Sequence, residues 1–400
     1  MPITALHAEN IKCFRTLDIT FGSLTTVIGE NAAGKSGITT ILALLRDILR
    51  TGLPNALSLH GGAAYLVNMR HPDPKITIRL AYTDPAGYTL PLPGELGHLR
   101  ITGGTLAFTL DFTGGALRIA EDTLQLTTVH LRPDGSTPPG IWAFTRRPDH
   151  TIHTAYLLPD GSPGDLSLPL PFLLPKTPLP PDHLMIEYAS LYPDTSLPAY
   201  LKTILIADIN PKSAKVSVSI GETTELAEDG TNMALVIGRI LQNPEQHRKL
   251  LNLVSDLLPF ITDITVPLPG TLAVTETCDP RTPIPAPLIS DGTVSALGTI
   301  LMLAFSGTGC LILEEPERSI HPALMPKLAS LILETSRTRQ IILTTHNPEL
   351  IRNLPAESLL LLTRNAGGCS TATRPAERTE LAEFLKNEIG IDELYIRNLL

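Results

Sequence analysis

Eight residues near the start of the chain combine glycine, lysine and serine at an informative spacing. They fit the pattern G-x-x-x-x-G-K-S at every position: Gly29, Glu30, Asn31, Ala32, Ala33, Gly34, Lys35 and Ser36. In such a loop the small residues let backbone N–H groups surround a phosphate, and a following helix adds a favourable dipole. We expect Lys35 to contact the β- and γ-phosphates and Ser36 to bind Mg²⁺. A glycine turn with a purely structural role is the alternative.

Two adjacent acids follow an apolar segment late in the chain. The β-branched and aliphatic residues of Cys310–Leu313 predict a strand, and Glu314 and Glu315 come directly after it. Taken alone, such acids are equally well explained as a structural strand exit. In a parallel sheet, however, ligands lie outside the carboxyl ends of the strands, so we expect both acids beside Lys35. Glu314 would then hold Mg²⁺, and Glu315 would orient or deprotonate the attacking water.

A histidine and a serine-glycine segment complete the set of candidates. His346 follows the predicted strand Gln340–Thr345. A lone histidine at a strand end is usually structural, but its position relative to the acids favours a γ-phosphate contact. Ser290 precedes the apolar helix predicted over Val294–Ala304 and suits an N-cap, while Gly292 at the same helix start would form a second anion site.

The surrounding patterns predict the elements that must position these residues. Leu24–Ile28 is a predicted strand, and Ile38–Leu49 carries apolar residues at helical spacing. Residues 75–158 alternate apolar and polar positions, which predicts an antiparallel sheet. Residues 131–200 contain 14 of the 36 prolines, which favours a loop-rich insertion or an extended connector. The last third alternates predicted strands and helices, which is typical of a parallel sheet covered by helices.

These patterns predict an α/β fold with a mixed or parallel core sheet, an antiparallel β lobe and a helical lobe. The expected segments are as follows: 1–60, the first part of a nucleotide-binding core; 61–160, the β lobe; 161–228, the proline-rich insertion; 229–305, the helical lobe; and 306–400, the second part of the core with C-terminal helices. The closing helices would pack on their own domain or dock a partner.

Composition limits the classes of protein that fit. The chain has 400 residues, 43% of them hydrophobic, and a net charge of -9, so a surface basic throughout is excluded and any contact with DNA must be a local patch. The candidates for such a patch, or for ordinary solvated charges, are Arg146, Arg147, Lys202, Lys212 and Lys215. Without a signal peptide or a long apolar segment, we expect a soluble, cytoplasmic protein that does not contact membranes.

The order of the motifs resembles that of ABC-type ATPases. The loop with Asn31, the start Ser290-Asp291-Gly292-Thr293, the strand closed by Glu-Glu-Pro-Glu, and Thr-Thr-His-Asn-Pro after the next strand occur in that sequence. The likeness is strongest to the SMC/RecF branch, and within it to the AAA_21 and OLD (overcoming-lysogenisation-defect) group. It covers residues 1–50 and 225–365. The segment Ile11–Arg15 is also similar to the start of this branch, where a basic residue, here Arg15, lies near the base and phosphates.

This resemblance implies a P-loop ABC head that uses ATP and Mg²⁺ and dimerises around the nucleotide. Ser290 and Gly292 would contact the γ-phosphate held by the partner protomer, His346 would be the switch histidine, and Arg318 and Ser319 would lie where the dimer interface crosses. Glu314 replaces the usual aspartate, which suggests slow turnover. The chain lacks charged heptads for a coiled-coil arm and lacks length for a Toprim nuclease domain. For the glutamine that links magnesium to the helical lobe, the β lobe offers only Gln125.

The function expected from these features is that of an ATP hydrolase working with a separate effector, such as a nuclease, in DNA repair or in defence against foreign DNA. An ATP-gated scaffold with little hydrolysis is the main alternative. A transporter subunit fits less well, because such subunits typically have Ser-Gly-Gly-Gln where this chain has Ser290-Asp291-Gly292-Thr293. A P-loop kinase would require neither Ser290 nor His346.

Overall fold

The computed structural model describes residues 2–70, 73–92, 97–136, 138–164, 178–188, 197–216, 225–268, 270–307 and 309–377. The chain divides into two compact units. Unit 1 contains Met1–Gly22, Ala32–Ile204 and Leu362–Ala372, and unit 2 contains Ser23–Asn31, Leu205–Leu361 and Thr373–Leu400. The boundary therefore falls inside the glycine-rich loop, after Asn31. The predicted C-terminal helices and parts of the proline-rich segment lie outside the described residues.

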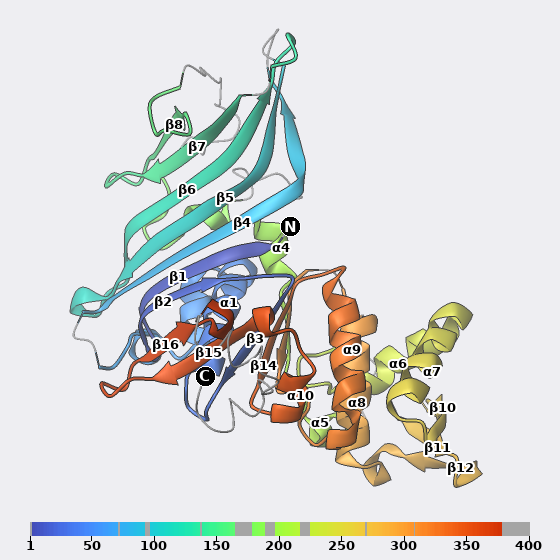
Figure 1. The fold of residues 1–400 in the computed structure, drawn as a ribbon. Coiled ribbons are helices and arrows are strands. Elements are labelled where there is room, and N and C mark those ends of the chain that lie inside the picture. The colour runs from blue at the N-terminus through green and yellow to red at the C-terminus, as the bar shows by residue number, and fades with distance from the viewer. Residues whose placement is uncertain are drawn as a thin grey trace. The chain divides into compact units, whose positions relative to one another are not determined.

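Unit 1 is built on a seven-stranded antiparallel sheet with the order β2-β1-β4-β5-β6-β7-β8 (Figure 1). Its strands are β1 (Ile3–Ile11), β2 (Phe14–Thr20), β4 (Lys75–Pro91), β5 (His98–Asp111), β6 (Arg118–Leu131), β7 (Pro139–Arg146) and β8 (Ile152–Leu157). The alternating residues Leu106, Phe108 and Leu110 are buried along one face, as a half-covered sheet requires. Because β1 pairs with β4, the antiparallel sheet also takes in strands that precede residue 61.

The described residues of unit 1 form four α-helices. They are α1 (Lys35–Thr51), α2 (Leu53–Leu59), α3 (Ala63–Leu66) and α4 (Leu197–Lys202). The helix α1 buries an apolar stripe that includes Ile38, Ile41 and Leu45, which explains the helical spacing of the sequence there. It ends at Gly52, whose φ of 87° is readily adopted by glycine.

The core of unit 2 is a parallel sheet in which β3 (Leu24–Gly29), β14 (Ile341–Thr345), β13 (Leu311–Glu314) and β9 (Leu205–Ala207) lie in that order. All three neighbouring pairs are parallel. Every residue of β3 and β14 is buried, as expected for strands covered on both faces. On its other side β3 neighbours β15 (Leu359–Arg364), and β16 (Ser370–Thr373) follows along the chain.

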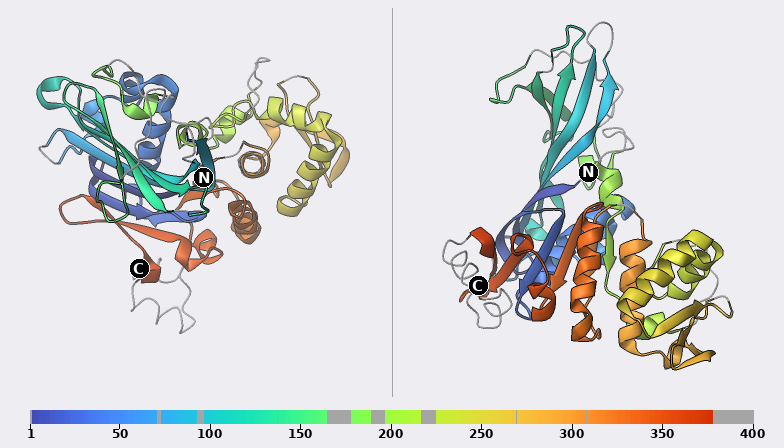
Figure 2. Two further views of the ribbon diagram at one scale, coloured as in Figure 1. Left: turned by 90° about the horizontal axis from the view of Figure 1, so that it is seen from above. Right: turned by 45° about the vertical axis from the view of Figure 1, so that its right-hand side comes forward.

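Helices of unit 2 pack around this sheet and around one another (Figure 2). They are α5 (Pro211–Ala214), α6 (Met233–Gln242), α7 (Pro244–Leu257), α8 (Asp291–Ala304), α9 (Met325–Ser336) and α10 (Pro348–Arg352). A small antiparallel sheet consists of β10 (Ile261–Thr265), β11 (Ala273–Glu276) and β12 (Asp279–Pro285). One hydrophobic cluster joins α6, α7, α8 and α9 to β13 and β14, so the helices and the sheet share a core.

The predicted fold class is confirmed, since the chain has a parallel core sheet, an antiparallel β lobe and a helical lobe. The predicted strand, loop and helix around residue 30 correspond to β3 and α1, and the later alternation corresponds to β13, α9, β14, α10 and β15. Within the described residues, no helix combines the length and the apolar character needed to cross a membrane.

Candidate active site

The four parallel strands of unit 2 end at one edge of the sheet. Ile28 of β3 pairs with Thr345 of β14, Thr344 pairs with Glu314 of β13, and Leu313 pairs with Ala207 of β9. Gly29 at the end of β3 and the residues that follow the other three strands, His346, Glu315 and Asp208, therefore lie along one edge. Polar groups at such an edge are accessible to a ligand, because the strands deliver them outside the packed core.

The glycine-rich loop leaves this edge after β3 and continues into α1 of unit 1. Glu30 and Asn31 are exposed, and Gly34 caps α1 with a φ of 108°. A Cβ at Gly34 would lie 2.5 Å from Sγ of Cys13, so both the backbone conformation and the available space require glycine. At the start of α1, Lys35 is 8% exposed, and Ser36 is exposed.

The start of α1 has the properties of an anion site. Gly34 provides no side-chain hydrogen bond to the helix, and the first turn contains no acidic residue. The first turn of this 17-residue helix thus has no acidic side chain of its own to oppose the N-terminal dipole, and Lys35 adds positive charge. These residues fit a polyphosphate group.

Both carboxylate oxygens of Glu315 have a charged or ionisable partner within unit 2. Oε1 lies 3.0 Å from Nδ1 of His346, and Oε2 accepts a hydrogen bond from Nη2 of Arg318 at 3.2 Å. The Glu315 backbone has a φ of 45°, and its N–H donates to the carbonyl of Thr344 at 2.9 Å. Burial alone would raise the pKa of Glu315, but Arg318 and His346 together hold it below its ordinary value.

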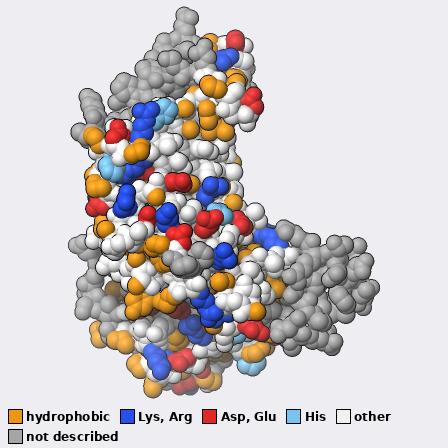
Figure 3. All heavy atoms as spheres, turned by 90° about the vertical axis from the view of Figure 1, so that its left-hand side faces the viewer, with side chains coloured by type: hydrophobic (Ala, Val, Ile, Leu, Met, Phe, Trp, Pro, Cys, Tyr) orange, Lys and Arg blue, Asp and Glu red, His pale blue; other side chains and the backbone are white. Residues whose placement is uncertain are grey.

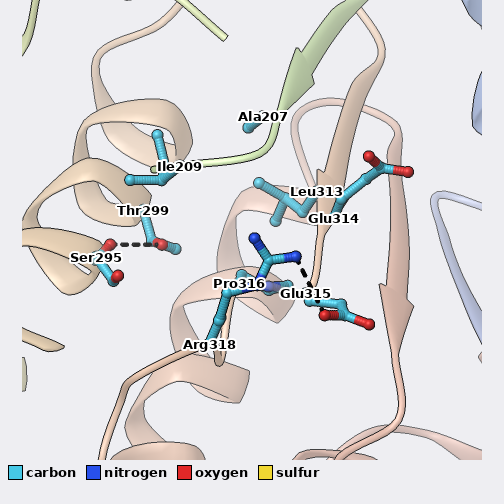
Figure 4. Close-up of a pocket in the computed structure, with 9 residues that line it drawn as sticks. All are labelled: Ala207, Ile209, Ser295, Thr299, Leu313, Glu314, Glu315, Pro316 and Arg318. Carbon is cyan, nitrogen blue, oxygen red and sulfur yellow. Dashed lines mark hydrogen bonds and ion pairs between the residues drawn. The ribbon is translucent and has the colours of Figure 1, made fainter. Parts of the chain in front are cut away.

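Arg318 also binds Asp208, the residue that follows β9. Nη1 of Arg318 lies 2.9 Å from Oδ1 of Asp208 (the same guanidinium reaches Glu315 in Figure 4). Asp208 is not among the residues predicted from the sequence, because β9 has only three residues and follows the proline-rich segment. An apolar run that ends in an acid, Ile204–Ala207 before Asp208, was the available signal. Gln125, the glutamine considered for a magnesium link, lies exposed in β6 of unit 1.

A second residue missed from the sequence is Glu317, whose side chain is buried beneath the turn after β13. Its Oε1 accepts a hydrogen bond from the hydroxyl of Thr345, and that hydroxyl accepts one from the N–H of Asn347 at 3.0 Å. Glu317 is 5% exposed, and burial raises its pKa above the ordinary value. The turn after β13 is thereby tied to the end of β14, next to His346.

Few protein side chains are arranged to hold a metal. Among the described residues, no three His, Cys, Asp or Glu side chains form a metal-binding group. Glu314, the last residue of β13, is partly buried at the strand edge. Mg²⁺ commonly takes one or two protein ligands together with phosphate oxygens and water, and a carboxylate such as that of Glu314 is a ligand of the kind this ion prefers.

The segment before α8 has structural roles within its own unit. Oγ of Ser290 accepts a hydrogen bond from the N–H of Thr293 at 3.1 Å and so caps the helix, as predicted. A Cβ at Gly292 would lie 2.3 Å from the carbonyl oxygen of Ser319, so this glycine allows a close backbone approach. Contact of Ser290 and Gly292 with a partner's nucleotide stays a prediction, as does the role of Arg15, which is exposed on β2.

The basic residues that were candidates for a DNA-binding patch differ in their surroundings. Arg146 donates to the carbonyls of His183 at 2.6 Å and Pro180 at 2.7 Å, and Lys215 pairs with Asp291. Arg147 is exposed. On the face drawn in Figure 3, positive and negative side chains are interspersed. Arg146 therefore holds its own unit together.

Comparisons with known proteins bear on the core of unit 2. Residues 215–352 match the AAA_21 family, described as "AAA domain, putative AbiEii toxin, Type IV TA system". No curated protein matches the sequence significantly.

Several solved structures of SMC heads align with nearly the whole chain at low sequence identity. The SMC head bound to the C-terminal winged-helix domain of ScpA has a TM-score of 0.49 at 14% identity, covering 93% of this chain and 97% of that one. The SMC head domain from Thermotoga maritima has a TM-score of 0.42 at 14% identity, covering 94% and 99%. An SMC head with an extended coiled coil, bound to the C-terminal domain of ScpA and derived from Pyrococcus furiosus, has a TM-score of 0.45 at 11% identity, covering 96% and 99%.

The family match includes the segment at the start of α8, the two acids at the end of β13 and the histidine after β14. These are three of the four motifs on which the predicted resemblance rested, and the fourth is the glycine-rich loop. Residues 215–352 are therefore similar to the AAA_21 family across three of the four motifs.

Proposed function

We propose that this chain is an ABC-type ATPase head that binds and hydrolyses Mg-ATP. The observation that supports this most strongly is the shared edge of β3, β14 and β13. It brings the start of the glycine-rich loop, His346 and the acids Glu314 and Glu315 to the ends of neighbouring parallel strands. This arrangement suits a reaction that needs phosphate binding, a metal ligand and a group that positions water.

Each residue has a distinct part in this proposal. Lys35 and the N–H groups of residues 31–36 bind the phosphates, and Ser36 and Glu314 hold Mg²⁺. Glu315 orients the attacking water and accepts its proton, while His346 faces the γ-phosphate. The metal, when bound, neutralises charge that develops on the phosphate oxygens.

We further propose that two copies pair around ATP, with Ser290 and Gly292 of one protomer at the nucleotide of the other. ATP would favour the paired state because it contacts both protomers only there, and its hydrolysis would remove that preference. The paired state would gate a separate effector, for which a nuclease acting in DNA repair or in defence against foreign DNA is the leading candidate.

The test is phosphate release from Mg-ATP by the purified chain and by Glu315→Gln, with Glu334→Gln on the exposed face of α9 as matched control. Glu315→Gln should lower turnover by at least about 100-fold while ATP binding persists, because the amide cannot accept a proton. In sedimentation experiments, ATP should convert this variant into a dimer. A wild-type chain that binds no ATP would contradict the proposal.

A second function is favoured by one specific observation. Both oxygens of Glu315 are engaged, by Arg318 and by His346, and the metal position has the longer Glu314. A chain that binds ATP and a partner but hardly hydrolyses would be an ATP-gated scaffold. Phosphate release with and without duplex DNA separates the two functions, because a scaffold dimerises with ATP yet releases negligible phosphate under either condition.

A further inference from the structure

Four ionisable side chains of unit 2 form a continuous chain of contacts at the strand edge. Asp208 binds Arg318 at 2.9 Å, Arg318 binds Glu315 at 3.2 Å, and Glu315 lies 3.0 Å from His346. They come from the ends of three adjacent strands and from the turn after β13. Figure 4 shows the Arg318 guanidinium beside the Glu315 carboxylate, next to a small recess that Ala207, Ile209 and Ser295 help to line.

Asp208 is held by backbone contacts that do not involve Arg318. The backbone N–H of Asp208 donates to the carbonyl of Glu228 at 3.0 Å, and the backbone N–H of Asn210 donates to the carbonyl of Asp229 at 3.0 Å. Between them, Ile209 packs so closely on α8 that a Cβ at Gly298 would lie 2.9 Å from its Cγ2. The Asp208 carboxylate is therefore presented from a fixed segment.

The side chains of Arg318 and Asp208 are both 49% exposed, so packing does little to orient either of them. They differ in length: the Asp208 carboxylate lies close to its hydrogen-bonded backbone, whereas the Arg318 guanidinium is at the end of a long side chain. A guanidinium offers N–H groups in a planar fork, and here two different nitrogens reach two carboxylates on separate elements. The two carboxylates therefore determine where the guanidinium lies, and the fixed Asp208 is the one that can anchor it.

Glu315 keeps hydrogen-bonding capacity despite its two partners. An ionised carboxylate has about four acceptor positions, and the contacts with Arg318 and His346 use one on each oxygen. The remaining positions are fixed in direction because both oxygens are held. A group that orients water benefits from such restraint, since misplacement of a reacting group by about 1 Å can cost about 100-fold in rate.

We propose that Asp208 and Arg318 are positioning residues for hydrolysis: Asp208 anchors Arg318, and Arg318 holds Glu315 in the orientation that receives the attacking water. This proposal rests on the proposed ATPase function. The family resemblance implies that Arg318 lies at the dimer interface. The positioning role is different, because Arg318 contacts both Asp208 and Glu315 within one protomer.

The experiment measures kcat and KM for ATP in Arg318→Ala, Asp208→Asn and the double variant, with Arg337→Ala on the exposed end of α9 as control. We expect Arg318→Ala to lower kcat about tenfold or more and Asp208→Asn to lower it about threefold, with KM within about twofold. The double variant should match Arg318→Ala, because Asp208 acts through Arg318. Arg337→Ala should be unaffected.

Three outcomes would overturn this inference. Unchanged or increased kcat in Asp208→Asn would show that the pair does not support Glu315, and additive losses in the double variant would show independent roles. If Arg318→Ala combined with Glu315→Gln no longer dimerises with ATP, Arg318 acts across the interface instead. A wild-type chain that does not hydrolyse ATP would contradict the proposed function itself. A wild-type chain that hydrolyses ATP, with a kcat that Asp208→Asn leaves unchanged, would contradict only the positioning role.

Discussion

The two units use the same types of charged residue in different ways. In unit 2, Asp208, Arg318 and Glu315 bind one another at an exposed strand edge. In unit 1, Arg146 donates to backbone carbonyls of Pro180 and His183, and the buried Asp122 accepts a hydrogen bond from the N–H of Met185 at 2.8 Å. The unit 1 residues hold a loop segment onto the sheet. The difference teaches that the partners of a charged group, more than its type, indicate whether it supports chemistry or folding.

This comparison leads to opposite expectations for substitutions. At the strand edge, the charged groups are accessible and bind side chains, so replacing one should change turnover with little effect on unfolding. In unit 1, the groups bind backbone partners of one loop segment, among them the buried Met185, so replacing one should lower the free energy of unfolding and leave the turnover of folded molecules unchanged. The following substitutions test the unit 1 side first, where the expected effects are largest.

Arg146→Met should have the largest effect on stability. It removes the two charge-assisted hydrogen bonds to the carbonyls of His183 and Pro180. It also removes the cation whose Nη1 lies 3.9 Å from Oδ2 of Asp122. The free energy of unfolding, measured by urea denaturation, should fall by about 3 kcal/mol. Arg147→Met, at the exposed next position, should change it by less than about 0.5 kcal/mol. Equal effects of the two substitutions would break the comparison.

Asp122→Asn should remove a pH dependence of the free energy of unfolding that arises in unit 1. Burial raises the pKa of Asp122 from 3.8 to about 7, against the lowering effects of Met185 and Arg146, while Glu187 nearby raises it further. The protonated form is thus favoured by folding, and the stability it contributes is lost as pH rises from the unfolded value through about 7. Between pH 5 and pH 8, wild type should lose about 2 kcal/mol more than Asp122→Asn.

The control for this experiment is Glu121→Gln, at the exposed neighbouring position on β6. It should keep the pH dependence of the wild type. If Asp122→Asn also keeps that dependence, Asp122 is ionised in the folded chain, and the account of its burial is wrong.

Glu317→Gln should have the smallest effect, although its site lies beside the catalytic candidates. An amide keeps the shape of the carboxyl group and an oxygen that accepts from the Thr345 hydroxyl, and burial, which raises the pKa of Glu317, already disfavours the charge that the substitution removes. The free energy of unfolding should change by less than about 1 kcal/mol. A loss above about 3 kcal/mol in urea denaturation would show that the ionised form is required there.

Many of the strands and helices around the candidate site were predictable from the sequence, because they depend on local patterns. The apolar runs of β3 and β14, the helical spacing of α1 and the cap at Ser290 each encode their element directly. The candidate residues at the ends of those strands followed from one rule about parallel sheets.

What escaped prediction depends on contacts between distant segments. Asp208 follows a strand of three residues that pairs with β13, more than 100 positions later in the chain, and the short apolar run before it is a weak local signal. The same holds for the closeness of Gly292 to Ser319, which gives that glycine a reason within its own unit. The bond between Glu317 and Thr345 likewise forms only when β13 and β14 lie side by side.

The most direct test of the central claim is the Mg²⁺ dependence of ATP affinity, because the claim requires Glu314 and the glycine-rich loop to meet at one nucleotide. Calorimetric titrations with Mg²⁺ and with a chelator would compare wild type, Glu314→Gln and the exposed control Glu334→Gln. We expect wild type and the control to bind ATP about tenfold more tightly with Mg²⁺, a difference of about 1.4 kcal/mol, and Glu314→Gln to lose most of that gain while still binding ATP with the chelator. A Glu314→Gln chain with the full Mg²⁺ dependence of the wild type would contradict the account.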